Sequence, residues 1–257
     1  MTLWTRQPGS VAEGIHHAVR LRDVTKSYGK GSRAVVALDR VSADIPSGTF
    51  TAVMGPSGSG KSTFLHCAAG LDRPTSGEVR LGPTDLSQLK EAPLTRLRRR
   101  RMGFVFQAFN LVPALTVVQN ITLPLRLERR KADQTWLREI VARVGLTDRL
   151  SHVPAELSGG QQQRVAIARA LVTRPEVIFA DEPTGALDPE TAKDILTLLR
   201  QAVTDMHQTV VMVTHDPVAA AHADSAVFLA GGRIVTSLDS PTADRVASTM
   251  AGLRRAA

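Results

Sequence analysis

Cysteine is almost absent from this sequence, with Cys67 the single example in 257 residues. A disulfide within the chain is therefore excluded, and the composition does not require an oxidising compartment. No apolar run approaches the roughly 18 residues of a membrane-spanning helix, and the stretch from Met1 to Arg20 lacks the apolar centre of a signal peptide. We therefore expect a soluble, cytoplasmic protein in which Cys67 is a small residue of the core.

Acidic residues are fewer than basic ones, with 24 Asp and Glu against 32 Lys and Arg, a formal net charge of +8. Much of the positive charge lies in residues 98–101 and 126–131. It suits any polyanion, whether nucleotide, nucleic acid or anionic lipid headgroups, or it forms a solvated basic face, and charge alone leaves these alternatives open. Hydrophobic residues make up 43%, which is enough for the core of one α/β domain with or without a small insertion.

Strand-like and helix-like stretches alternate from Val19 onwards, whereas residues 1–17 lack periodicity and are interpreted as a tail. The patterns predict strands at 49–54, 79–81, 103–106, 177–180 and 210–213, helices at 61–69, 135–144, 165–171 and 189–203, and a hairpin around Gly231 and Gly232. Such alternation predicts a mostly parallel sheet covered by helices. The ligands of such a sheet bind at the carboxyl ends of its strands.

A glycine-rich segment, Gly-Pro-Ser-Gly-Ser-Gly-Lys-Ser at positions 55–62, lies between a predicted strand and a predicted helix and fits the phosphate-loop pattern in full. Its glycines allow backbone N–H groups to turn toward phosphate oxygens, and the helix N-terminus adds partial positive charge. Lys61 would reach the β- and γ-phosphates, and Ser62 would bind Mg²⁺. The predicted phosphate contacts are Gly55, Pro56, Ser57, Gly58, Ser59, Gly60, Lys61, Ser62 and Thr63.

Two acidic residues, Asp181 and Glu182, directly follow the apolar stretch 177–180. Paired acids at the end of a strand are often only a turn. Beside a phosphate loop, however, Asp181 is the expected partner for the metal, and the neighbouring carboxylate of Glu182 can polarise the water that attacks the γ-phosphate.

The segment Leu157-Ser-Gly-Gly-Gln161 narrows the class. Ser158 and the two glycines precede a helix and form a second anion-binding N-terminus, which suggests that one subunit closes on the triphosphate held by another. An ordinary N-cap explains Ser158 but not the whole segment. Together with the phosphate loop, these residues resemble the signature of the ATP-binding cassette (ABC) family, over about residues 19–240.

The resemblance implies a phosphate-loop NTPase fold: a RecA-like, mostly parallel α/β sheet with a small antiparallel β subdomain and a helical insertion at about 90–155. The nucleotide-binding domain would span 18–245, between tails at 1–17 and 246–257. The implied activity is hydrolysis of ATP with Mg²⁺, coupled to transport across a membrane.

Further site residues follow from the resemblance alone. Tyr28 would stack on adenine, with core packing as the alternative, and Gln107 would sense Mg²⁺ and the attacking water. Asp188 lies in the loop that crosses the dimer interface, and His215 would contact the γ-phosphate. The implied catalytic residues are thus Lys61, Gln107, Glu182 and His215, the metal ligands Ser62, Gln107 and Asp181, and the further ATP contacts Ser158, Gly159, Gly160, Gln161 and Asp188.

Segments 103–113 and 70–77 resemble the branch of the family that includes MacB, LolD and FtsE. The resemblance implies a homodimer on the inner face of the cell membrane, driving a separate FtsX- or MacB-like permease in lipoprotein, macrolide or peptide export or extraction. The apolar loop from Phe109 to Leu115 is the expected docking site, with core packing as the alternative.

A soluble ABC protein acting on nucleic acid or ribosomes is the competing hypothesis, which the positive charge would suit. Chromosome-associated members insert a long coiled coil between the two motifs, whereas Lys61 and Leu157 are only 96 positions apart. Translation-associated members carry two cassettes, and this chain has one. Nucleic acid is therefore not expected as a partner.

Overall fold

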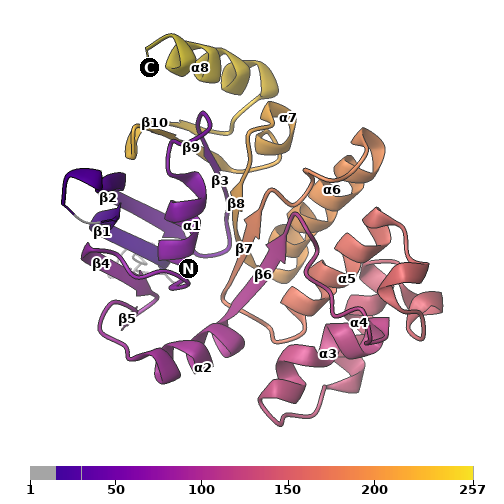
Figure 1. Cartoon of the computed structure of the whole chain (residues 1–257). Helices are drawn as coiled ribbons and strands as arrows, with labels where there is room; N and C mark the ends of the chain where they lie inside the picture. Colours follow the sequence, from indigo (N-terminus) through magenta and orange to yellow (C-terminus); the bar gives the residue numbers. More distant parts are fainter. Residues whose placement is uncertain (1–15, 30, 257) are drawn as a thin grey trace, which may run out of the picture.

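The computed structural model describes residues 16–29 and 31–256 (Figure 1). The predicted tail at 1–17 lies outside the described residues except for its last two positions, and His17 already begins a strand. The strands are β1 (His17–Tyr28), β2 (Val35–Pro46), β3 (Phe50–Met54), β4 (Ser76–Leu81), β5 (Thr84–Asp85), β6 (Met102–Phe106), β7 (Val177–Asp181), β8 (Thr209–Val213), β9 (Ser225–Ala230) and β10 (Arg233–Asp239). The α-helices are α1 (Lys61–Ala68), α2 (Glu91–Arg101), α3 (Val117–Leu127), α4 (Gln134–Arg143), α5 (Gly159–Leu171), α6 (Pro189–Met206), α7 (Pro217–Ala220) and α8 (Ala243–Ala256).

A six-stranded sheet with the order β10-β9-β3-β8-β7-β6 forms the centre of the molecule. All neighbours in it are parallel except β10 and β9, which form the hairpin predicted at Gly231 and Gly232. Every residue of β3 and β8 is buried, as expected for parallel strands covered on both faces. The predicted mostly parallel α/β sheet is confirmed.

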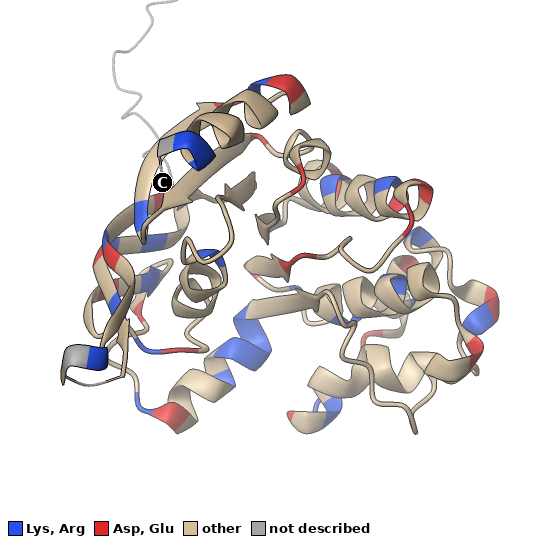
Figure 2. Cartoon of the chain, turned by 45° about the horizontal axis from the view of Figure 1, so that its top comes forward, with Lys and Arg blue, Asp and Glu red and all other residues tan. Residues whose placement is uncertain are grey.

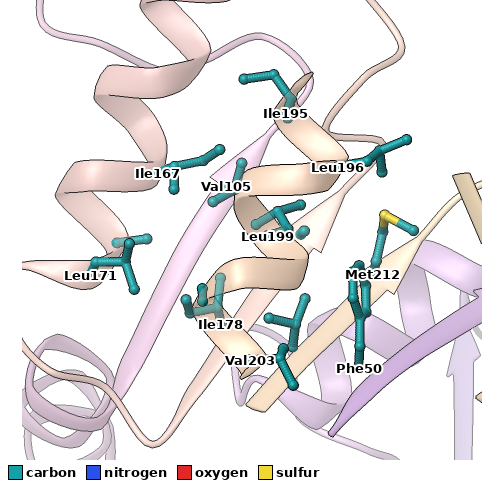
Figure 3. Packing of buried hydrophobic residues seen from close by; sticks show 14 of the residues in the cluster. Phe50, Val105, Ile167, Leu171, Ile178, Ile195, Leu196, Leu199, Val203 and Met212 are labelled. Atoms are coloured by element: carbon teal, nitrogen blue, oxygen red, sulfur yellow. The ribbon is translucent and has the colours of Figure 1, made fainter. Parts of the chain in front are cut away.

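Side chains of these strands point alternately to two hydrophobic clusters because successive residues of a strand face opposite sides. Phe50, Ile178 and Met212 contact the cluster that contains helices α5 and α6 (Figure 3). Val53, Phe179 and Val211 belong to the cluster beneath α1 and the second sheet. The central sheet is therefore enclosed on both faces, and its carboxyl edge is left to bind ligands.

The second sheet is antiparallel, with four strands in the order β2-β1-β4-β5. Val19, Leu21 and Leu38 on its inner face are fully buried against α1 residues such as Leu65. This sheet is the small antiparallel β subdomain that the family resemblance implied. It also positions the end of β1 near the phosphate loop.

The segment 90–155, predicted as a helical insertion, contains one strand of the central sheet as well as helices. Residues 102–106 form β6, which pairs with β7 along its whole length and is part of the central sheet, and α2 leads directly into it. The helical part consists of α3, α4 and two short 3₁₀ turns before α5. The strand predicted at 103–106 could be read from local pattern, but its place in the central sheet could not, because its partner β7 lies some 75 positions further along the chain.

Most of the predicted C-terminal tail at 246–257 belongs to the helix α8. Val246 and Met250 are buried in the same cluster as α5 and α6, so this helix is anchored by apolar contacts at helical spacing. Among the described residues, no helix is both long enough and apolar enough to cross a membrane.

Candidate nucleotide-binding site

The carboxyl ends of four parallel strands bring most of the predicted site residues together. The phosphate loop follows β3, Gln107 follows β6, Asp181 ends β7 with Glu182 next to it, and His215 lies two residues after β8. These strands are neighbours in the sheet, so residues far apart in sequence meet along one edge, as expected for an open α/β sheet.

The phosphate loop has the backbone that a phosphate cradle requires. Gly60 is the N-cap of α1 with φ of 101°, and a Cβ there would lie 2.3 Å from the Ala37 carbonyl oxygen, so only glycine fits. The hydroxyl of Ser59 is buried without a hydrogen-bond partner among the described residues. A Cβ built on Gly58 would have no atom within 4 Å, so the space next to this residue is open. An orphaned buried hydroxyl and free N–H groups at a helix start fit a bound triphosphate.

Lys61 and Asp181 carry the principal charges of this cradle. The Lys61 ammonium donates to the Gly55 and Pro56 carbonyl oxygens at 3.0 Å each. Burial lowers the pKa of Lys61, while the carboxylates of Glu182 and Asp181 act in the opposite direction. The backbone carbonyl groups of the loop thus hold the Lys61 ammonium, which needs only to turn outward to meet phosphate oxygens.

A magnesium ion would find suitable ligands beside Lys61. Burial raises the pKa of Asp181, the nearby His66 lowers it, and the Ser62 hydroxyl donates a hydrogen bond to this carboxylate. Burial removes water from the Asp181 carboxylate, so a cation beside it would stabilise its charged form. No group of three or more His, Cys, Asp or Glu side chains that could hold a metal exists among the described residues. The Asp181 carboxylate and the Ser62 hydroxyl offer oxygen donors, which suit Mg²⁺ because this ion combines one or two carboxylates with phosphate and water oxygens.

Glu182 and His215 form a direct pair. The Glu182 Oε1 lies 2.8 Å from His215 Nδ1, and the Glu182 backbone N–H donates to the Val213 carbonyl oxygen at 3.0 Å. Glu182 has φ of 47°, a left-handed conformation that is uncommon for a residue with a side chain and that clusters at functional sites. This backbone conformation directs the carboxylate toward His215, which follows the end of β8.

The backbone next to Gln107 is held by a glutamine that sequence reasoning did not single out. The Gln107 side chain itself passes so close to Gly185 that a Cβ there would lie 2.9 Å from the Gln107 Nε2. The fully buried Gln163 of α5 donates to the carbonyl oxygens of Pro183 at 2.5 Å and Phe106 at 3.4 Å. Gln163 therefore joins the segments that carry Gln107 and Glu182, and its place after the signature was the only sequence signal for it.

The signature residues lie at the start of α5. Ser158 is the N-cap, and its hydroxyl and the Gln161 side chain form a reciprocal capping box. A Cβ on Gly160 would lie 2.3 Å from Thr191 Cγ2, in the helix that Asp188 caps by accepting from the Thr191 N–H. Gly159 lies beside Leu187. Within residues 16–29 and 31–256, no hydrogen bond joins Ser158, Gly159, Gly160 or Gln161 to the phosphate loop.

Tyr28 is 43% exposed at the end of β1. Its hydroxyl donates to Asp72 at 2.7 Å, and the Lys26 ammonium lies 4.9 Å from the ring centroid. Burial raises the pKa of Tyr28, and its bond to Asp72 raises it further, whereas a hydrogen bond with Thr63 lowers it. The Thr63 contact places this ring next to the helix of the phosphate loop, where stacking on a base remains the prediction.

The loop predicted to dock a permease is organised by two residues that sequence reasoning missed. Arg169 of α5 donates to the carbonyl oxygens of Phe109, at 2.8 Å, and Asn110, both of which have positive φ. The fully buried Asn120 bonds the backbone of Val112 and Leu115. The position of Asn120 within the mostly apolar stretch 111–125 was the only sequence signal. The loop therefore has a defined shape, and Leu111 contacts the core.

The comparisons with known proteins agree with this geometry. Residues 38–185 match the family profile described as ABC transporter. The uncharacterized ABC transporter ATP-binding protein YvrO of Bacillus subtilis is 45% identical over 220 residues, which are 84% of this chain and 94% of YvrO. This chain therefore belongs to the ABC transporter family, as an ATP-binding subunit.

Two further relatives bear on the architecture. The macrolide export ATP-binding/permease protein MacB of Salmonella choleraesuis is 44% identical over 84% of this chain, but the chain spans only 34% of that protein. The dimeric structure of the cassette MJ0796 in a post-hydrolysis state, bound to ADP and Pi, matches 86% of this chain and 98% of its own with a TM-score of 0.78 and 42% identity. The phosphate-loop NTPase fold with two sheets is confirmed.

Proposed function

We propose that this subunit hydrolyses ATP and that two copies of it close on two ATP molecules to drive a separate membrane permease. The observation that carries the proposal is the edge of the central sheet, where Lys61, Asp181 and Glu182 converge. The Ser158 site of the same chain makes no hydrogen bond to the phosphate loop within the described residues, so a second copy would have to supply it. The dimer of the MJ0796 cassette supports this arrangement.

Each residue at the edge has a part in the proposed reaction. Lys61 and the loop N–H groups bind the β- and γ-phosphates. Ser62 and Asp181, with Gln107, would hold Mg²⁺, which neutralises charge on the phosphates when it is bound. Glu182 accepts the proton of the attacking water, and His215, 2.8 Å from its Oε1, orients that carboxylate and reaches the γ-phosphate.

Replacing Glu182 by glutamine tests the reaction and the dimer together. An amide cannot accept the proton, so turnover should fall by about 10²–10⁴-fold, while ATP still binds. In size-exclusion chromatography with light scattering, the variant should have the mass of a dimer in the presence of ATP and of a monomer in its absence. Adding Ser158→Arg in the same chain should abolish that dimer.

The matched control is Glu139→Gln, which removes a carboxylate from α4 whose ion-pair partner among the described residues is Arg143. It should hydrolyse ATP at the rate of the unmodified protein. A Glu182→Gln variant that stays monomeric at saturating ATP, or that keeps full turnover, would contradict the mechanism.

The permease is proposed to dock in a groove of about 380 Å³ between α2, β6, α3 and α5. Its lining is mostly apolar and includes Phe104, Leu123, Pro124 and Leu127, and it reaches Asn110 in the loop that follows Gln107. A short helix of a membrane protein would fit such a groove through its apolar face. Because the loop leads directly from Gln107, occupation of the groove would be linked to the state of the nucleotide.

Leu127→Asp places a charge in this groove at a side chain that is 56% exposed, so folding should be unaffected. The variant should keep its basal ATPase rate and lose binding to a co-expressed FtsX- or MacB-like permease, measured by pull-down. Val235→Asp alters an equally apolar side chain on β10, 48% exposed, and should bind like the unmodified protein. Equal binding of both variants would refute the docking site.

The partner and cargo are proposed from the branch of the family. The resemblance of residues 103–113, together with 44% identity to a macrolide export protein, supports an FtsX- or MacB-like permease on the inner face of the cell membrane. The cargo would be of the lipoprotein, macrolide or peptide type, and it would be selected by the membrane subunit. The competing role on nucleic acid or ribosomes has only the positive charge in its favour, and that charge suits anionic lipid equally.

A further inference from the structure

The excess positive charge of the chain is concentrated on two adjoining segments. Residues 91–101 and 126–131 contain nine basic and two acidic residues, a net charge of +7 out of the +8 of the whole chain. Arg100 joins them, because its guanidinium donates to Glu128 at 3.0 and 3.1 Å. Figure 2 shows Lys and Arg along the C-terminal half of α2. The two segments therefore form a single area.

The arginine run in α2 divides into an inner and an outer row, as helical spacing requires. Arg98 and Arg101 turn inward, where Arg98 donates to the Gly70 carbonyl oxygen at 2.5 Å and Arg101 to Glu176 and Thr84. Arg96 and Arg99 turn outward and are exposed. The inner row stabilises the fold, whereas nothing in the packing requires the outer one.

Five basic side chains form what we call the basic surface: Arg96, Arg99, Arg126, Arg129 and Lys131. All five are exposed, and within the described ranges none has a hydrogen-bond or ion-pair partner. Glu128, the acidic residue between them, is already paired with Arg100 and Arg130 and has a side chain only 5% exposed. The basic surface therefore presents positive charge that the protein itself does not compensate.

The basic surface borders the proposed docking groove, since Arg99 and Leu127 line that groove. A groove that receives a helix of a membrane-embedded permease must open toward the membrane. The basic surface would then face the headgroups, whose charge acts over about 8–10 Å at physiological salt. Residues 91–101 and 126–131 contain no aromatic side chain on which a base could stack, whereas the exposed Leu127 suits a bilayer interface.

We propose that the basic surface binds anionic lipid headgroups and holds the subunit on the membrane with its docking groove facing the permease. This inference rests on the proposed function, because that function sets the orientation of the groove. Each Lys or Arg near an anionic bilayer contributes about fivefold in binding. Loss of three of them should therefore weaken binding by about 100-fold.

Vesicle flotation of the full chain, without permease or ATP, tests the proposal. The unmodified protein should float with vesicles of phosphatidylcholine and phosphatidylglycerol, but not with phosphatidylcholine alone or in high salt. The triple variant Arg96→Gln, Arg126→Gln, Lys131→Gln should lose this binding by about 100-fold. It should keep its basal ATPase rate, because none of these residues contacts the nucleotide site or lines the groove.

The matched control, Arg138→Gln, Arg254→Gln, Arg255→Gln, removes the same charge from exposed positions on α4 and α8 and should float like the unmodified protein. Absence of flotation with anionic vesicles, or equal loss in both triple variants, would overturn the basic surface as a lipid site. The proposal would also be overturned if the triple variant of the basic surface lost binding to duplex DNA while its binding to anionic vesicles stayed unchanged. The ATP-dependent dimer of Glu182→Gln needs no lipid, so its formation separates failure of this inference from failure of the proposed function.

Discussion

Replacement of Asn120 by leucine tests whether one buried amide determines the shape of the docking loop. The Asn120 Oδ1 accepts from the Val112 N–H at 2.8 Å, and its Nδ2 donates to the carbonyl oxygens of Val112, Leu115 and Thr116 at 3.1, 2.9 and 3.2 Å. The Val112 and Thr116 carbonyl oxygens have second partners, the N–H groups of Leu115 and Asn120. Leucine therefore leaves two groups without a partner, the Val112 N–H and the Leu115 carbonyl.

The expected cost follows from those two groups. An unsatisfied buried polar group costs about 1–3 kcal/mol. Both of these hydrogen bonds are only partly buried, so the free energy of unfolding should fall by about 2–4 kcal/mol, in the lower part of the range for two groups. For a chain of this length that corresponds to a melting temperature about 5–15 °C lower. Because Asn120 contacts none of the nucleotide-site residues, basal ATPase below the transition should be retained, while stimulation by the permease should be lost as the loop loosens.

Thr122→Val is the control for this prediction, since it also removes a polar group from α3. Its hydroxyl donates only to the Val118 carbonyl oxygen of the preceding turn, which keeps its helical bond, so the loss should stay below about 1 kcal/mol. Calorimetry and circular dichroism would measure both variants. Equal stability of Asn120→Leu and Thr122→Val would refute the reasoning about the loop.

Two further predictions concern the nucleotide. Tyr28→Ala should weaken ATP affinity by about 5- to 150-fold and Tyr28→Trp should preserve it, because stacking of a base on an aromatic ring contributes about 1–3 kcal/mol. Equal ATP affinity of the alanine variant and the unmodified protein in calorimetric titration would remove Tyr28 from the site. Gly60→Ala should abolish ATP binding without unfolding the chain, because the new methyl group would displace the Ala37 backbone, 2.3 Å away. Full ATP binding by the Gly60→Ala variant would refute the requirement for glycine at this position.

Motifs contiguous in the chain could be predicted from sequence because each is defined by local backbone chemistry. The phosphate loop needs glycines, a lysine and a helix start within a few positions, and Asp181 and Glu182 follow a run of apolar residues that only a buried strand explains. The alternation of strands and helices predicted the class of fold for the same reason. The pairing of Ser158 with a second copy is still a prediction, because one chain cannot display it.

Tertiary structure decided the features that depend on distant partners. A strand at 103–106 was predicted from its local pattern, but its pairing with β7 is a feature of the tertiary structure because β7 lies far along the chain. The packing of α8 is another, because the core that buries Val246 and Met250 comes from earlier elements. The arginine run shows the same division, since only folding sends Arg98 inward and leaves Arg99 exposed. Composition determined the amount of positive charge, and packing determined which of it stays uncompensated, because neutralisation depends on the carboxylates and carbonyl groups that the fold brings within hydrogen-bond distance.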